Sequence, residues 1–519
     1  DEALVSARMK LARATLRLRK FKETRNRNRN NCLFNKSNKL YYTSLRSTAN
    51  VVSDPPPQQD VSKFWSKLFT RTAKHNEDAA WLKVEEENTQ HIQQQQWKDI
   101  TLEELRKTIK RLTNWKSPGI DQIQNYWYKH LVDLHEILLD AINHVVKNPS
   151  DLPSWFTCGL TTLIYKNKGL ERDAKNYRPI TCLPTAYKLV TLLFTDRVYQ
   201  HLVDQKILPP EQKGIKRKAR GCKDHLLLDK VILERTHGNK RNLGVAWIDY
   251  QKAYGSIPHS WIVRVLKLYK VDPVIITFLE TTIKLWRTRL VLHHATGSIE
   301  TGEIYITCGI FQGDSFSPLI FCVALFPLSH ILNRAKLGFR LKKNRISHLL
   351  YIDDLKIYTA NEEELQRALQ IVEEFSNDIN MSFGLDKCAI LVIKNGSIST
   401  TNIYPDTPKL DDDENKAYRY LGILEGLDFH VEKVKKATKA EYISRVRKIL
   451  KSDIDGDKTM TAICAFAMPV LRYTASTYTD PMEEEDSPAV RMYTTVNALH
   501  SPDMFSTALT ISPESSWKH

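Results

Sequence analysis

Two adjacent carboxylates, Asp353 and Asp354, lie between two short apolar segments of the chain. Segments 346–351 and 355–359 have the composition of short strands, so we expect the two acids at the tip of a hairpin. Neighbouring carboxylates repel each other unless a cation lies beside them, and hard divalent cations such as Mg²⁺ prefer carboxylate oxygens. The pair therefore indicates a metal site, with an ordinary surface turn as the alternative.

A third acid and a glycine-containing loop accompany this pair. Asp249 follows the apolar run 243–248, and a carboxylate at the end of a buried strand is held rigidly enough to bind a metal. Segment 309–318 (GIFQGDSFSP) lies between the two acidic sites in the chain. Its glycines allow the backbone to approach a ligand closely, and the Gln312 amide offers both a donor and an acceptor. Such a loop can lie against a nucleotide or a base pair.

The composition favours a polyanionic partner. The chain has 519 residues, too many for one compact core, which predicts about two to four domains. It carries 76 Lys and Arg against 60 Asp and Glu, a net charge of +16. That surplus indicates nucleic acid before membrane, although a merely basic soluble protein would show the same charge.

Cysteine usage and the chain start point to an intracellular protein. The eight cysteines form no Cys-x-x-Cys pair and no Cys/His cluster with zinc spacing, so we expect reduced core residues. No run of 18 uncharged apolar residues occurs, and a transmembrane helix is not expected. The chain begins without Met and with charged residues instead of a signal segment, which indicates a fragment or a processed piece.

The chain divides into four parts. Residues 1–60 are predicted to form a basic arm and a Pro-rich linker, with RNRNRNN typical of a flexible segment. The arm could contact phosphates, act as a nuclear localisation signal, or be a solvated tail. Residues 61–150 have helical patterns, and 151–425 alternate irregularly between strand and helix, which predicts an α+β architecture. Residues 426–519 begin with a basic amphipathic helix, and 400–415 are predicted to form a surface loop.

The order of these motifs resembles that of reverse transcriptases from non-LTR (LINE-type) retrotransposons. Asp249 with Ala253-Tyr254, the loop from Gln312 to Pro318, and Tyr351-Ile352-Asp353-Asp354 resemble motifs A, B and C of that family. Further segments match in chain order: 115–121 the N-terminal extension, 163–166 and 176–180 the finger motifs, 212–224 the insert between fingers and palm, 383–387 motif D, and 420–422 motif E, the primer grip.

This resemblance implies a right-hand polymerase fold of the α+β class with a helical N-terminal extension. Fingers and palm are expected over 151–425 and a truncated helical thumb over 426–519. The implied activity is RNA-directed DNA polymerisation with two Mg²⁺ ions, for which Mn²⁺ is a substitute. The implied partners are an RNA template, a DNA primer or target DNA, and dNTPs, with no membrane. The expected location is intracellular and nuclear.

The same resemblance assigns the three acids to metal binding and catalysis. Asp249 and Asp353 are expected to bridge both ions, and Asp354 to support the ion nearer the primer. Lys387 is expected to act as general acid for the pyrophosphate leaving group, with a plain solvated Lys as the alternative.

Four more residues are expected to bind the nucleotide. Tyr254 matches the aromatic steric gate that excludes a 2′-hydroxyl, and its alternative is an ordinary core Tyr. Lys166 and Arg178 are expected to hold the triphosphate, Arg through a bidentate fork. Gln312 is expected beside the nucleotide.

The chain departs from the family pattern at Gly255, where another Asp is usual. That position is not among the expected metal ligands, but the loss of a side chain could loosen the turn beside Tyr254. Signatures of a zinc knuckle, endonuclease, RNase H, protease or integrase are missing. Two alternatives stay open: a degenerate, catalytically inactive relative that still binds nucleic acid, and an RNA-templated RNA polymerase, which the aromatic Tyr254 disfavours.

Overall fold

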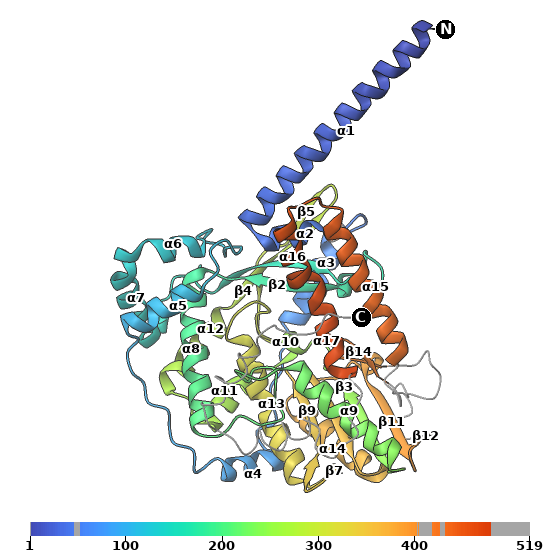
Figure 1. Cartoon of the computed structure of the whole chain (residues 1–519). Coiled ribbons are helices and arrows are strands. Elements are labelled where there is room, and N and C mark those ends of the chain that lie inside the picture. Colours follow the sequence, from blue (N-terminus) through green and yellow to red (C-terminus); the bar gives the residue numbers. More distant parts are fainter. Residues whose placement is uncertain (1, 46–51, 402, 404–417, 426–430, 479–519) are drawn as a thin grey trace, which may run out of the picture.

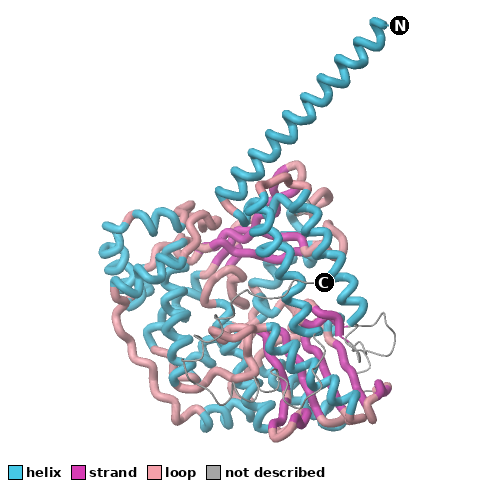
Figure 2. Tube along the Cα trace, in the orientation of Figure 1, coloured by secondary structure: helices cyan, strands magenta, loops and turns pink. Residues whose placement is uncertain are grey.

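The structure, a computed structural model, describes residues 2–45, 52–401, 403, 418–425 and 431–478. Figure 2 shows helices mixed with sheets, and the strands form two five-stranded sheets and two short hairpins. The expected mixture of helix and strand is confirmed. Most of the predicted loop 400–415 and everything after 478 lie outside the described residues.

The first sheet has the strand order β2-β1-β4-β5, with β6 beside β4. β1 runs antiparallel to β2 and pairs Tyr165 with Tyr177, so the chain reverses over residues 166–176. Lys166 lies at the start of this reversal and Arg178 just after it. The strands are β1 (Cys158–Tyr165), β2 (Tyr177–Cys182), β4 (Arg287–His294), β5 (Gly297–Glu300) and β6 (Ile304–Tyr305).

The second sheet has the order β12-β11-β3-β10-β9, and all neighbouring strands are antiparallel. Its central strand β3 has the sequence LGVAWI, in which every residue is buried, as expected for a strand covered on both faces. The strands are β3 (Leu243–Ile248), β9 (His348–Tyr351), β10 (Asp354–Thr359), β11 (Ala389–Lys394) and β12 (Ser397–Ser399).

Two hydrophobic clusters cover the two faces of this sheet. Ile248 and Ile357 belong to the main core, together with residues of α13 and α14. Trp247 and Tyr358, their neighbours along the strands, belong to a second cluster with α9 and the hairpin β13–β14. Alternate residues therefore serve different cores. These elements are α9 (Cys222–Gly238), α13 (Ser317–Arg334), α14 (Glu362–Asp378), β13 (Tyr418–Tyr420) and β14 (Ile423–Glu425).

Helices surround both sheets. α5 begins after Thr101 with a capping box, in which the Thr101 hydroxyl accepts the Glu104 amide at 3.2 Å. The predicted basic helix after residue 427 is also present, as α15. The other elements are α2 (Asn38–Leu45), α3 (Gln58–Phe69), α4 (Ala80–Asn88), α5 (Leu102–Arg111), α6 (Asn125–His130), α7 (His135–Lys147), α8 (Thr185–Asp204), α10 (Ala253–Ser256), α11 (His259–Leu268), α12 (Pro273–Leu285), β7 (Phe339–Leu341), β8 (Asn344–Ile346), α15 (Val431–Leu450), α16 (Gly456–Ala462) and α17 (Met468–Tyr478).

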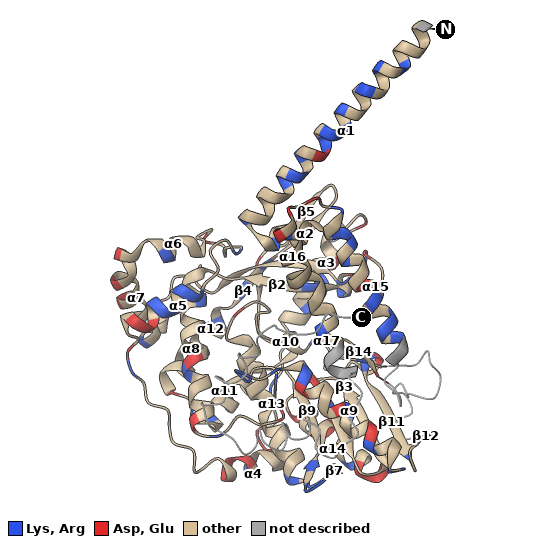
Figure 3. Ribbon diagram, viewed as in Figure 1, with Lys and Arg blue, Asp and Glu red and all other residues tan. Residues whose placement is uncertain are grey.

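The flexible arm predicted around RNRNRNN is wrong, because this segment is helical. α1 runs from Glu2 to Lys36 and projects from the rest of the chain in Figure 1. Lys and Arg dominate its charged residues along its whole length (Figure 3). Its last turns are anchored by tertiary contacts, which local composition does not show.

The anchor is a small hydrophobic cluster between the two ends of the described chain. Phe34 of α1 and Tyr41 of α2 are buried with Phe466 and Ile449 from the C-terminal helices. The Tyr41 hydroxyl lies 2.5 Å from the Ser452 hydroxyl. α1 and α2 are therefore fixed on the helices α15–α17.

One described helix, α13, is long and apolar enough to cross a membrane by length and composition alone. Its residues are mostly buried inside the fold, which is the pattern of a core helix.

We predict that Tyr41→Ala loosens this anchor without unfolding the sheets. Truncation of a buried aromatic side chain costs about 3–5 kcal/mol, and here the loss falls on a separate cluster. Hydrogen exchange of the α2 amides should become faster, while that of β3 stays slow. Leu40→Ala, on the exposed side of the same helix, is the matched control. Equal exchange in both variants would contradict the anchor.

Candidate active site

The structure brings the three predicted acids to one edge of the second sheet. β10 pairs with β3 so that Leu355 lies opposite Ile248. Continued by one residue, this register places Asp354 opposite Asp249. Asp353 precedes Asp354 in the turn between β9 and β10, which confirms the hairpin expected from the sequence.

The turn itself depends on a buried glutamine. Ile352 has a φ of 58°, a left-handed conformation that a β-branched residue adopts only under constraint. The Gln212 side-chain oxygen accepts the Ile352 amide at 3.0 Å and the Gly214 amide at 2.9 Å. A Cβ at Gly214 would lie 2.5 Å from the Ile352 side chain. Gln212 is thus a positioning residue whose role the sequence did not reveal.

Burial disfavours the ionised form of two of the three acids, and the third is paired with a lysine. Burial, followed by the charges of Asp353 and Asp249, raises the pKa of Asp354 to about 7. Burial also raises the pKa of Asp353. The Lys387 ammonium lies 3.1 Å from one Asp249 oxygen and 3.3 Å from the other. Lys387 therefore lies beside Asp249 and forms an ion pair with it.

The carboxylate oxygens of Asp249, Asp353 and Asp354 suit a divalent cation, but the three side chains do not form a complete metal site. Within the described residues, no group of three or more His, Cys, Asp and Glu side chains is arranged to hold a metal ion. Instead, the Lys387 ammonium forms an ion pair with the Asp249 carboxylate. Burial first, and the charges of neighbouring carboxylates second, raise the carboxyl pKa values, and a divalent cation between the oxygen ligands would stabilise the ionised forms.

A group of cations faces the acids. The ammonium groups of Lys166 and Lys252 both donate to the Lys175 carbonyl, at 3.0 and 2.9 Å. Burial, followed by the charge of Lys166, lowers the pKa of Lys252 to about 7. The pKa of Lys166 is also lowered, by burial and by the charges of Lys387 and Arg178. Such repulsion among cations is what a bound phosphate would remove.

Lys252 was not among the predicted site residues. It lies three residues after Asp249 and two before Tyr254, so its position within this motif was the available signal. Its backbone is left-handed, with a φ of 51°, and its ammonium lies 5.4 and 5.2 Å from the ring centres of Phe64 and Trp65. The N-terminal helix α3 therefore helps to hold this cation.

Tyr254 lies where a steric gate could act. Its ring stacks on Phe321 with centres 5.2 Å apart and planes within 4°. Burial, and to a smaller extent the charge of Asp353, raises the pKa of its hydroxyl. The ring is thus fixed, only partly buried, and near the Asp353–Asp354 turn.

The turn after Tyr254 is held firmly despite Gly255. The Gly255 amide donates to the Lys252 carbonyl at 2.7 Å, and Ile310 donates to the Tyr254 carbonyl at 2.7 Å. A Cβ at Gly255 would lie 3.3 Å from the Leu68 side chain. Backbone bonds therefore replace the support that a side chain at this position could give.

Gln312 lies on a loop attached to the first sheet. Its carbonyl accepts the Thr181 amide of β2 at 2.8 Å, and a Cβ at Gly313 would lie 2.3 Å from the Thr181 oxygen. Asp314 is buried and accepts the Thr191 hydroxyl at 2.7 Å. These contacts place Gln312 at the end of the strand that also carries Arg178.

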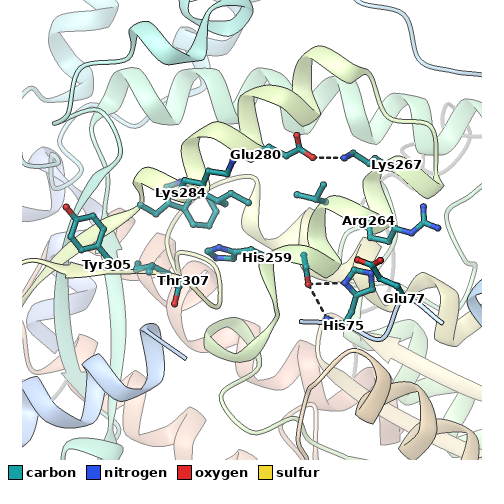
Figure 4. A pocket seen from close by; sticks show the side chains of 14 residues that line it. His75, Glu77, His259, Arg264, Lys267, Glu280, Lys284, Tyr305 and Thr307 are labelled. Atoms are coloured by element: carbon teal, nitrogen blue, oxygen red, sulfur yellow. Dashed lines mark hydrogen bonds and ion pairs between the residues drawn. The ribbon is translucent and has the colours of Figure 1, made fainter. Parts of the chain in front are cut away.

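A separate cavity of about 600 Å³ lies between α11, α12 and the segment around His75 (Figure 4). None of the predicted site residues lines it. Its cations are largely paired, Lys267 with Glu280 at 2.6 Å and Arg264 with Glu86. The clustered charges at the sheet edge therefore mark the better candidate for the active site.

We predict that Asp354→Asn stabilises the metal-free protein more at pH 8 than at pH 5. The folded state keeps the Asp354 proton up to about pH 7, whereas the ordinary value is 3.8. The folded state thus binds more protons between these values, and stability falls as pH rises through them. Thermal unfolding with a chelator measures this, with exposed Asp386→Asn as control. Equal shifts at both pH values would contradict it.

Comparisons with known proteins agree with this arrangement. The family model described as "Reverse transcriptase (RNA-dependent DNA polymerase)" matches residues 164–424, half of the chain. An R2 Pol polyprotein of Popillia japonica is 28% identical over 64% of this chain and 45% of its own length. The polymerase of the mobile element jockey from Drosophila funebris is 23% identical over 63% of this chain and 35% of its own.

A third relative, the transposon TX1 149 kDa protein of Xenopus laevis, is 24% identical over 62% of this chain and 24% of its own length. The chain thus spans between a quarter and a half of these relatives. R2 and jockey are non-LTR retrotransposons, in agreement with the resemblance seen in the motifs. The chain belongs to the reverse transcriptase (RNA-dependent DNA polymerase) family.

Proposed function

We propose that this chain is the RNA-directed DNA polymerase of a non-LTR retrotransposon, adding dNTPs to a primer 3′-hydroxyl on an RNA template. The observation that carries the proposal is the group of three carboxylates facing four cations. The register of β3 and β10, continued by one residue, brings Asp249 opposite Asp354, and Lys387 forms an ion pair with Asp249 while its charge also acts on Lys166. In this scheme the first sheet belongs to the fingers, the second to the palm, and α15–α17 to the thumb.

Asp249, Asp353 and Asp354 would hold two Mg²⁺ ions, or Mn²⁺ in their place. Bound there, the ions would lower the pKa of the primer hydroxyl and neutralise the leaving pyrophosphate. The protein would hold these carboxylates in place through the β3–β10 register and the Gln212 bonds to the turn.

The cations would bind the triphosphate and complete proton transfer. Lys166, Lys252 and Arg178 offer charge and hydrogen-bond donors to phosphate oxygens, and a phosphate would relieve the repulsion that lowers the pKa of Lys252. The Lys387 side chain is 57% exposed, so it is free to leave Asp249 and donate a proton to pyrophosphate.

Nucleic acid would bind through basic segments such as α1. RNA template and DNA primer or target DNA fit the charge surplus and the basic α1. We further propose an intracellular, nuclear location, supported by this basic segment and by the target DNA that such an element would use.

We predict that the purified chain extends a primer on an RNA template with dNTPs and Mg²⁺. Asp353→Ala should reduce extension by at least about 100-fold, because it removes a metal ligand. Asp133→Ala, at an exposed acid outside the motifs named above, should leave extension unchanged. Failure of the wild type to extend would refute the proposal. Binding without extension would support an inactive relative, and a preference for NTPs an RNA polymerase.

We predict that Tyr254→Val admits ribonucleotides. Removal of the ring leaves space for a 2′-hydroxyl, so the ratio of kcat/KM for UTP to that for dTTP should rise about tenfold or more. Tyr254→Phe keeps the ring and should keep the discrimination. If the Val variant discriminates like wild type, Tyr254 is a core residue and not a gate.

A further inference from the structure

A buried group of three charges lies directly behind the catalytic turn. The Lys356 ammonium is 2.6 Å from an Asp229 oxygen and 2.6 Å from a Glu425 oxygen. All three side chains are fully buried. We name Asp229, Lys356 and Glu425 the buried triad. Lys356 is two residues after Asp354 on β10, and alternation along a strand directs both side chains to the same face.

Aromatic residues enclose the triad. The Trp247 indole donates to Glu425 at 3.1 Å, and the Tyr358 hydroxyl donates to Asp229 at 2.6 Å. Lys356 lies 4.5 Å from the Trp247 ring centre and 4.8 Å from that of Tyr420. Burial and the charge of Asp229 raise the pKa of Glu425, which reduces the negative charge of the group.

The triad joins three elements that are distant in sequence. Asp229 belongs to α9, Lys356 to β10, and Glu425 to the hairpin β13–β14. The same hairpin is tied to the candidate active site from its other strand, because the Tyr418 hydroxyl donates to the Lys387 carbonyl at 3.0 Å. Tyr473 of α17 donates to the hairpin turn at Leu421, at 2.6 Å. The hairpin thus lies between the catalytic strands and the C-terminal helices.

Stability alone does not explain a triad of this kind. Removing three charges from water offsets much of the attraction between them, and apolar residues of similar volume often stabilise a core as well or better. Hydrogen-bonded ion pairs are directional, unlike apolar contacts, because each bond requires its partner in one defined position. A buried triad therefore fixes the relative position of the elements that carry it.

We propose that the buried triad sets the position of the hairpin β13–β14 relative to the Asp353–Asp354 turn, and thereby holds the primer 3′ end against the catalytic acids. The inference rests on the proposed polymerase function and on the primer grip that the resemblance implies for residues 420–422 of this hairpin. Lys356, Asp229 and Glu425 are positioning residues, since none of them reaches the reacting atoms.

The test replaces all three charges together, Asp229→Asn, Lys356→Met and Glu425→Gln, so that no buried charge is left unpaired. The rate of single dNTP addition at saturating primer–template should fall about tenfold to 100-fold, the scale expected when reacting groups are misplaced by about 1 Å. KM for dNTP and the thermal midpoint should stay close to wild type. A variant with the wild-type rate would overturn the proposal.

The matched control is Glu85→Gln with Arg334→Met. This pair also joins distant elements through a buried acid, with 2.7 Å between their charged atoms, but it lies on α4 and α13. The control should keep the wild-type rate. If it loses rate as much as the triple variant, the effect is a general loss of stability and the proposal fails.

A second readout is independent of polymerase activity. Amides of residues 418–425 should exchange at least about tenfold faster in the triple variant, whereas those of β3 should not change. Glu425→Gln alone, which keeps the side-chain shape, should show a smaller effect in the same direction and serves if the triple variant does not fold. If amide exchange is unchanged in both variants, the positioning role of the buried triad is overturned, even if the wild type is inactive. If the wild type is inactive but exchange is altered, only the proposed polymerase function is refuted.

Discussion

The antiparallel pairing of β3 with β10 is the constraint on which the rest of the site depends. Its register places Leu355 opposite Ile248 and so carries Asp354 to a position facing Asp249. A shift of one residue would move every side chain of β10 to the other face of the sheet. Asp354 would leave its partner acid, and Lys356 would leave the second hydrophobic cluster for the main core. One register therefore fixes both the clustered carboxylates and the buried triad.

In the site without ligands, the pKa of an acid is raised and the pKa of a lysine is lowered. Burial and neighbouring carboxylates raise the pKa of Asp354 to about 7, while burial and neighbouring ammonium groups lower the pKa of Lys252 to about 7. Each group would lose its charge more easily than in water. A divalent cation would stabilise the ionised acids, and a phosphate the protonated lysines. The fold thus holds a charge pattern that such ligands complement. Lys387 interacts with both groups, through its ion pair with Asp249 and its charge near Lys166.

The N-terminal helices belong to the same body as the sheets. Trp65 of α3 covers Lys252 in the site, and Glu85 of α4 is buried against His330 and Arg334 of α13. At the other end, Tyr41 packs on the helices that follow the hairpin β13–β14. The hairpin is therefore connected to β10 on one side and, through α17, to the helices carrying α1 on the other.

The sequence by itself determined the chemical groups and their local setting. Apolar runs around Asp249 and around Asp353-Asp354 predicted the strands and the hairpin, because a short apolar run is a local pattern in the sequence. The order of the motifs along the chain predicted the reverse transcriptase family. Tertiary structure alone decided the helical state of the basic arm and the roles of Gln212 and Lys252. It also formed the buried triad, whose members Asp229 and Glu425 lie far apart in the chain. The physical reason is that hydrogen bonds and desolvation depend on distance in space, which composition and spacing along one segment do not contain.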